Sequence, residues 1–339
     1  MKGKPFIIPI FLPQAGCRHR CAFCNQSLTS GKNDNPLSFP KTIIDEVDRF
    51  LSFKKKEASD IQLAFYGGNF LGIYQDKINI LLNEASNLAI QKKINSIRFS
   101  TRPDTIDNHR IELLKPFPVS TIELGVQSLD DNILNLINRG HTSHDTIRAV
   151  SILKENNYKV GLQIMVGLPG DNGTQSIKTA HIVADLLPDF VRIFPTIILS
   201  DTLLADWYKE GKYKPITLDE SVEIVKNIYL IFQEKNIEVI RMGLQPSDLL
   251  KENIIAGPYH PAFGHMVLSK IFFEKAYNII NSKFRGINNI IIQVAPKNIS
   301  NMRGQKNSNI NLLKKQFDIC TIEVVPISSL SENEIFIHS

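Results

Sequence analysis

Three cysteines lie within eight residues near the start of the chain, and their type and spacing suit a metal cluster. Cys17, Cys21 and Cys24 follow a C-x3-C-x2-C pattern, whereas the fourth cysteine, Cys320, lies near the end of the sequence. Three thiolates can bind three irons of a [4Fe–4S] cluster and leave the fourth iron open to another ligand. The pattern therefore predicts an iron–sulfur site with Cys17, Cys21 and Cys24 as its protein ligands.

A zinc site is the main alternative at these cysteines. Structural zinc usually takes four protein ligands in two close pairs, so the fourth ligand would have to be His19, inside the first spacer, or a distant residue. A disulfide framework would need a different cysteine count and distribution. Because the basic neighbours Arg18 and Arg20 favour thiolates over inert thiols, we favour the cluster. Cys320 lies in a largely apolar stretch, where we expect a buried thiol.

Short apolar segments with the composition of strands alternate with segments of helical periodicity along most of the chain. The cysteine loop follows the first such strand, and the pair Gly67–Gly68 follows the second. Repeated strand-then-helix order implies parallel strands joined by right-handed crossovers. We therefore predict an α/β fold with a partial or full parallel (β/α) barrel, whose chemistry lies at the carboxyl ends of the strands; an open doubly wound sheet is the alternative. The expected strands are Phe6–Phe11, Ile61–Tyr66, Ser96–Ser100, Thr121–Val126, Lys159–Val166, Phe190–Pro195 and Val239–Met242, and the expected helices are Lys41–Phe53, Gln75–Ile90, Asp107–Leu114, Leu129–Ile137, Ser143–Asn156, Gly173–Leu187 and Leu218–Lys235.

The pattern changes after Gly243, so we expect a barrel over residues 1–243 and a small α/β region over 244–339 that could cap the substrate. Residues Pro246–Gly264 hold three prolines and no strand pattern. Between Ser269 and Cys320 there are nine basic residues and two acids. A basic face can attract an anionic partner such as RNA, but a solvated lysine-rich surface explains the same composition.

Several blocks of the chain, taken together with the cysteine loop, resemble the radical SAM superfamily. The resemblance is closer to the branch that contains the Elongator catalytic subunit and oxygen-independent coproporphyrinogen III oxidase, and it covers roughly residues 5–245. It implies that S-adenosylmethionine chelates the open iron and is cleaved reductively to a 5′-deoxyadenosyl radical, which abstracts hydrogen from an unidentified substrate. The blocks are Phe65–Phe70, Ser100–Asp104, Glu123–Ser128, Asn138–His141 and Val166–Gly170.

The same resemblance assigns cofactor-binding roles. It places the methionyl amino group of S-adenosylmethionine at Gly67 and Gly68, with Asn69 where relatives often carry Thr or Glu. It places the methionyl carboxylate at Arg139, whose planar fork suits a carboxylate. Taken alone, Arg139 could equally be a cation that stabilises a helix C-terminus.

Further contacts with S-adenosylmethionine follow from the resemblance, and two of them involve departures from the usual residue. Gln127 and Gln163 would contact ribose hydroxyls, although relatives often carry Asp at the position of Gln163. Ser100 stands where much of the branch has a Glu, and Phe23 would pack against adenine. The cluster and the cofactor would carry the chemistry, and the sequence does not identify a catalytic side chain. His260, which is followed by Pro261, is a candidate to face the substrate.

Two substrate classes stay open, a small molecule and RNA. The resemblance also suggests a reductant such as ferredoxin or flavodoxin as a partner. Since only residues 244–339 follow the barrel, we expect no acetyltransferase domain and not the same wobble-uridine modification. There are two alternative functions. One is a tRNA-binding or tRNA-modifying Elongator-like protein, and the other is a non-catalytic metal-binding protein associated with RNA.

No apolar run reaches membrane-spanning length, and the N-terminal run suits a strand better than a signal peptide. We therefore expect a cytoplasmic protein.

Overall fold

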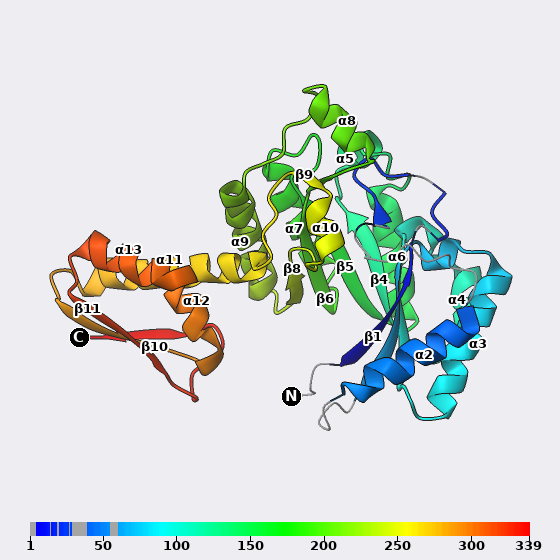
Figure 1. Ribbon diagram of the computed structural model, residues 1–339, viewed down its shortest axis with the longest axis horizontal. Helices are drawn as coiled ribbons and strands as arrows, with labels where there is room; N and C mark the ends of the chain where they lie inside the picture. The colour runs from blue at the N-terminus through cyan, green and yellow to red at the C-terminus, as the bar shows by residue number, and fades with distance from the viewer. Residues whose placement is uncertain (1–4, 14, 19, 27, 29–38, 55–59) are drawn as a thin grey trace. The chain divides into compact units, whose positions relative to one another are not determined.

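The computed structural model describes residues 5–13, 15–18, 20–26, 28, 39–54 and 60–339 (Figure 1). The chain forms two compact units. The first consists of Met1–Thr217 and Ile228–Tyr259, and the second consists of Leu218–Asn227 and His260–Ser339. None of the helices among the described residues is long and apolar enough to span a membrane.

A seven-stranded sheet forms the centre of the first unit. Its strands run in parallel and follow the order of the chain, from β1 at one edge to β8 at the other. A doubly wound sheet would reverse its strand order, so the order confirms the predicted barrel type. Because β1 and β8 are the outermost strands and do not pair with each other, the barrel is partial. The strands are β1 (Phe6–Leu12), β2 (Ile61–Gly67), β3 (Ser96–Thr101), β4 (Val119–Gln127), β5 (Lys159–Val166), β6 (Phe190–Pro195) and β8 (Glu238–Met242).

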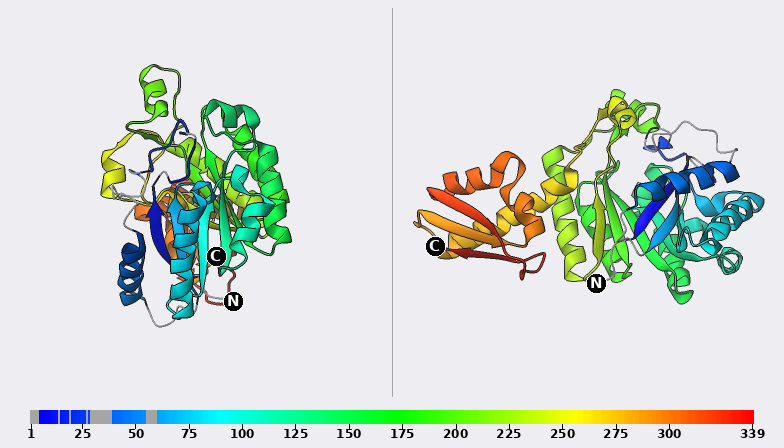
Figure 2. Two further views of the ribbon diagram at one scale, coloured as in Figure 1. Left: turned by 90° about the vertical axis from the view of Figure 1, so that its right-hand side faces the viewer. Right: turned by 60° about the horizontal axis from the view of Figure 1, so that its bottom comes forward.

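Helices lie along this sheet and bury one of its faces (Figures 1 and 2). In β4 the residues Ile122, Leu124 and Val126 are fully buried, and because they alternate along the strand they share one face. Helix α6 packs against β4 and β5, α7 against β5 and α2 against β1. The helices are α2 (Phe39–Ser52), α3 (Gln75–Ile90), α4 (Asn108–Leu114), α5 (Asp131–Leu136), α6 (Ser143–Glu155), α7 (Thr174–Asp185), α8 (Leu203–Lys209), α9 (Leu218–Glu234), of which the first part belongs to the second unit, and α10 (Asp248–Glu252).

The stretch Pro246–Gly264 contains regular structure, which corrects the expectation of a segment without a strand. Helix α10 lies there, and strand β9 (Ile254–Ala256) pairs antiparallel with β7 (Ile198–Leu199). Ser247 caps α10, because its hydroxyl accepts a hydrogen bond from the backbone N–H of Leu250. A strand of three residues is too short to show the alternation on which strand prediction rests.

The second unit holds a small α/β region of the predicted kind, although residues 244–259 belong to the first unit and Leu218–Asn227 to the second. Its three-stranded sheet has the order β11 (Thr321–Pro326), β10 (Asn289–Val294), β12 (Ile335–His338). Helices α11 (Phe263–Lys283), α12 (Ile299–Arg303) and α13 (Ser308–Phe317) supply apolar side chains to a common core with the sheet. Cys320 is exposed just before β11, so the expected burial of its thiol is wrong; the core is filled by the neighbouring Ile319 instead.

Candidate functional site

The cysteine loop leaves the carboxyl end of β1 and is held against the end of β2. The backbone N–H of Gly68 donates to the carbonyl of Leu12 at 2.9 Å, and the N–H of Asn69 donates to the carbonyl of Ala15 at 2.7 Å. These bonds fix the start of the loop at the strand ends, where the fold positions chemistry. Cys21 is buried in this loop.

Glycines let the two backbones approach this closely. A Cβ atom on Gly68 would lie 2.1 Å from the carbonyl oxygen of Ala15, and one on Gly16 would lie 2.2 Å from the carbonyl oxygen of Asn69. Gly16 and Gly67 also adopt the positive φ angles of 73° and 109° that glycine tolerates best. The backbone at Gly68 therefore packs closely against the cysteine loop. The role of Gly67–Gly68 toward a methionyl group stays a prediction.

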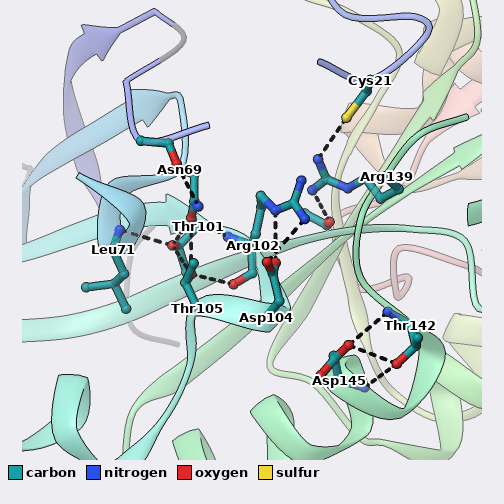
Figure 3. Close-up of polar contacts among 12 residues, drawn as sticks. Cys21, Asn69, Leu71, Thr101, Arg102, Asp104, Thr105, Arg139, Thr142 and Asp145 are labelled. Carbon is teal, nitrogen blue, oxygen red and sulfur yellow. Dashed lines mark hydrogen bonds and ion pairs between the residues drawn. The ribbon is translucent and has the colours of Figure 1, made fainter. Parts of the chain in front are cut away.

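Asn69 joins three segments of the site through its side-chain amide (Figure 3). Its Oδ1 accepts hydrogen bonds from the hydroxyls of Thr101 and Thr105 at 2.7 and 3.1 Å and from the backbone N–H of Arg102 at 3.0 Å. Its Nδ2 donates to the carbonyl of Gly16 at 3.2 Å. Both ends of this buried amide are thus occupied by the protein. Asn69 ties the end of β3 to the cysteine loop.

Two arginines bring positive charge to the cysteines. The Nη1 group of Arg139 donates to the Sγ of Cys21 at 3.3 Å, and its Nη2 donates to the carbonyl of Gly125 (Figure 3). Arg102 forms an ion pair of 2.9 Å with Asp104. Arg139 Nε and Arg102 Nη1 are buried and have no hydrogen-bond partner among the described residues. Buried donors are normally satisfied, so these two atoms are available to an anionic ligand.

The pKa values of the Cys17 and Cys24 thiols are raised in the folded chain. Burial, with a smaller contribution from Cys21 and Cys17, raises the pKa of Cys24 to about 12. Burial also raises the pKa of Cys17, although Arg139 and Arg102 oppose the shift. Binding to iron requires thiolates and releases their protons. Among the described residues, no three His, Cys, Asp or Glu side chains converge on one point for a single metal ion, and His19, the ligand considered for zinc, lies outside those residues.

His141 is a buried residue beside this site to which the sequence interpretation assigned no role. Burial first, and the positive charges of Arg139 and Arg102 next, lower its pKa to about 3. The imidazole is therefore neutral over the usual range of assay pH. The sequence held one signal for a role of His141 in the site: it lies in the block Asn138–His141, two residues after Arg139.

Most of the remaining cofactor-binding candidates lie on the strands beside the loop. Gln163 Nε2 on β5 donates to the Ser100 hydroxyl of β3 at 3.4 Å and to Glu123 at 3.1 Å. Gln127 ends β4 in a left-handed conformation, with φ of 69°, and is buried. Phe23 packs with Trp207 in the apolar clusters around Ala22 and Leu204. The fold thus brings the predicted residues of β3, β4 and β5 to one region.

Glu123 is the centre of a polar network that sequence reasoning missed. It is fully buried, with Arg98 Nη2 at 2.6 Å from its Oε1 and Arg192 Nε at 2.9 Å from its Oε2. The hydroxyl of Tyr66 also donates to Oε1 at 2.9 Å. The signal in the sequence was a charged residue inside each of the apolar strands β3, β4 and β6, since such residues need buried partners.

His260 is the first residue of the longer of the two segments that form the second compact unit. Its Nδ1 accepts a hydrogen bond of 3.1 Å from the backbone N–H of Ala262, at the N-terminus of α11. This bond gives His260 a local structural role, and its role toward a substrate stays a prediction.

Comparison with protein families gives a match to two models. The model of the Radical SAM superfamily matches residues 11–181, and that of the Radical_SAM C-terminal domain matches residues 188–272. Curated relatives include the tRNA uridine(34) acetyltransferase of Methanocaldococcus infernus, 28% identical over 256 residues that make up 65% of this chain and 48% of the relative. The Elongator complex protein 3 of Saccharomyces cerevisiae is 28% identical over 135 residues, or 39% of this chain and 24% of the relative. This chain spans about half the length of the first relatives it matches.

Solved structures share the fold. The archaeal Methanocaldococcus infernus Elp3 with an N-terminus deletion has a TM-score of 0.60 at 21% identity, over 82% of this chain and 63% of that one. Coproporphyrinogen III oxidase (HemN) from Escherichia coli has a TM-score of 0.50 at 16% identity, over 69% of this chain and 54% of that one. These two structures show a shared fold, and the match to the Radical SAM superfamily model confirms the superfamily that the sequence blocks resemble.

Proposed function

The chain belongs to the radical SAM superfamily and is a radical SAM enzyme, and from this premise we propose that Cys17, Cys21 and Cys24 are the protein ligands of its [4Fe–4S] cluster. The family implies the cluster and S-adenosylmethionine as cofactors. One observation carries the residue assignment. The cysteine loop at the end of β1 is hydrogen-bonded to the chain at the end of β2, and the buried Arg139 contacts its Cys21.

The charges of the site fit these cofactors. Three thiolates and a methionyl carboxylate bring negative charge into a buried place, where it needs cationic or hydrogen-bonding partners. Arg139 and Arg102 are buried there, and each keeps a nitrogen without a partner among the described residues. When bound, the two cofactors supply radical hydrogen abstraction. The protein then has to hold them, balance their charge and exclude water.

We assign the binding of S-adenosylmethionine to the strand ends. Arg139 would take the methionyl carboxylate, the backbone of Gly67 and Gly68 the amino group, and Gln127 and Gln163 the ribose hydroxyls. Ser100, next to Gln163, and Phe23, against the adenine, would complete the contacts.

Asn69 has a different place in this proposal. Its Oδ1 already accepts from three donors of the protein. We therefore assign it to positioning the cysteine loop through Gly16 rather than to direct contact with the cofactor.

Radical SAM enzymes need a reductant, and we propose a ferredoxin or flavodoxin in this role. For the substrate, two observations favour tRNA over a small molecule. The relatives named tRNA uridine(34) acetyltransferase suggest it, and the stretch between Ser269 and Cys320 carries nine basic residues against two acids. Binding of tRNA should then weaken steeply as salt rises, because neutralised phosphates release counterions. Absence of salt-dependent binding would leave the small molecule.

Metal analysis after anaerobic reconstitution tests the cluster ligands. The wild-type protein should bind about four irons and four sulfides, as a cubane requires. Cys17→Ala, Cys21→Ala and Cys24→Ala should each lose them, whereas Cys320→Ala is the matched control, because this thiol is exposed in the second unit. Zinc without labile sulfide in the wild-type protein would contradict the proposal.

A further inference from the structure

A row of polar side chains crosses the face of the first unit's sheet that is not packed against its helices. Glu123 and Gly125 are two positions apart on β4 and so share this face. A Cβ atom on Gly125 would lie 2.7 Å from Nη2 of Arg139, the same arginine that contacts Cys21. The row therefore lies on the face that holds the cofactor site.

The strand register extends this row to the edge strand β8. Gln163 on β5 pairs with Arg192 on β6, and Arg192 pairs with Arg241 on β8. Neighbouring strands are about 4.8 Å apart, and β6 and β8 lie side by side in the sheet (Figure 1). Two guanidinium groups are thus neighbours at one end of the row.

Positive charge exceeds negative charge in this row. Glu123 is the acid shared by Arg98 and Arg192, so one carboxylate faces two cations. Arg241 forms no ion pair with an acid in the described part of the chain; its Nε donates to the carbonyl of Gly243 and its Nη2 to Gln245. Burial and, next, repulsion by Arg192 lower the pKa of Arg241. Three guanidiniums and one carboxylate leave an excess of two positive charges.

Both arginines at this end keep donors for a ligand. Arg192 uses Nε and Nη2 toward Glu123 and Tyr66, and no bond to its Nη1 occurs in the described structure. Likewise, no hydrogen bond to Nη1 of Arg241 occurs in the described structure. The side chain of Arg192 is 17% exposed, and Arg241 is half-buried, so a ligand can reach them. A guanidinium with unused donors suits an oxyanion such as phosphate or carboxylate.

We propose that Arg192 and Arg241 form an oxyanion subsite that binds a phosphate or carboxylate group of the substrate. This inference rests on the proposed function, because that function makes this face the one where substrate meets the cofactors. Arg192 holds its place through Glu123 and Tyr66, and Arg241 through the backbone beyond β8. The subsite is therefore built before the ligand arrives, which lowers the cost of binding.

Calorimetric titration of the reconstituted protein in the presence of saturating S-adenosylmethionine, with inorganic phosphate and separately with acetate, tests the subsite. One of these anions should bind at a single site in the millimolar range, and the tighter one identifies the source as phosphate or carboxylate. Arg241→Gln should weaken this binding by about 10- to 100-fold, as expected for loss of a charge-assisted hydrogen bond. Arg148→Gln is the matched control, because this arginine is exposed on α6 and pairs with Asp145, and it should bind as the wild type does.

Two results would overturn the inference: no binding of either anion by the wild type, or equal binding by the wild type and Arg241→Gln. Arg192→Lys is a second variant that keeps the charge beside Glu123 but loses the fork, and it should weaken binding as well. Iron and sulfide are measured on the same samples. If the protein holds the cluster but does not bind the anion, the subsite is refuted and the proposed function stands. If it binds the anion but holds no cluster, the proposed function is refuted and the anion site stands.

Discussion

Replacing Asn69 with alanine tests whether this residue positions the cysteine loop or serves only the cofactor. The substitution removes an amide that accepts three hydrogen bonds and donates a fourth to Gly16. If Asn69 ties the loop to β3, the cluster-free protein should already lose stability. If its function is limited to contact with S-adenosylmethionine, the cluster-free protein should be unaffected.

The size of the loss follows from the groups that are left without partners. The hydroxyls of Thr101 and Thr105 lie 2.9 Å apart, and Thr105 also reaches the carbonyl of Arg102 at 2.7 Å, so both keep a bond. The N–H of Arg102 and the carbonyl of Gly16 have no second partner in the described structure. Arg102 is buried whereas Gly16 is only partly buried, so we count the N–H of Arg102 alone. An unsatisfied buried group costs about 1–3 kcal/mol in the free energy of unfolding.

Urea denaturation followed by tryptophan fluorescence measures this loss. Trp207 is the single tryptophan of the chain. It is partly buried and packs against an apolar cluster of the first unit, so its signal reports on the unit that holds the loop. Asn135→Ala is the matched control on the exposed surface of α5 and should change stability by less than about 0.5 kcal/mol. A cluster-free Asn69→Ala protein as stable as this control would refute the reasoning.

Three further changes have defined outcomes. Gly68→Ala forces a Cβ to 2.1 Å from the Ala15 carbonyl and should lower both stability, by about 1–3 kcal/mol, and iron content; unchanged iron binding would show that the loop can shift. Arg139→Gln should weaken S-adenosylmethionine binding to the reconstituted protein by about 10- to 100-fold in equilibrium dialysis, and equal affinity would remove Arg139 from the carboxylate site. The pKa of His141 is lowered from 6.5 to about 3 in the folded protein, so the unfolded state takes up a proton first and stability falls as pH drops from 6.5 toward 3. In His141→Gln this slope should be shallower by up to about 1.4 kcal/mol per pH unit, as measured by urea denaturation at several pH values; an unchanged slope would contradict the buried neutral imidazole.

The parallel half-barrel could be predicted because its strands and helices carry strong local signals. Strands β5 and β6 and helix α3 have the predicted bounds, since each is a long apolar or amphipathic run between clear breaks. The cysteine loop and Gly67–Gly68 could be placed at the strand ends by their order alone. Their mutual packing could not, because it depends on a backbone hydrogen bond between Asn69 and Ala15 across more than fifty residues.

The polar row on the inner face lay beyond sequence reasoning. Glu123 sits in a strand whose other residues suggest an apolar core, and its partners Arg98 and Arg192 come from two other strands. Sequence shows that such charges need partners but not which partners they meet. The exposure of Cys320 was missed for a related reason. Cys320 lies just before β11, between the buried Ile319 and the exposed Thr321, and composition does not show which of two adjacent residues faces the core.

Formation of 5′-deoxyadenosine from S-adenosylmethionine tests the central claim most directly. The anaerobically reconstituted wild-type protein, supplied with a reductant, should release 5′-deoxyadenosine, and Cys320→Ala should do the same. Cys21→Ala, which removes the thiol that Arg139 contacts, should release none above the background without protein. A wild-type protein that holds iron and sulfide yet forms no 5′-deoxyadenosine, or a Cys21→Ala protein that forms as much as the wild type, would contradict the account.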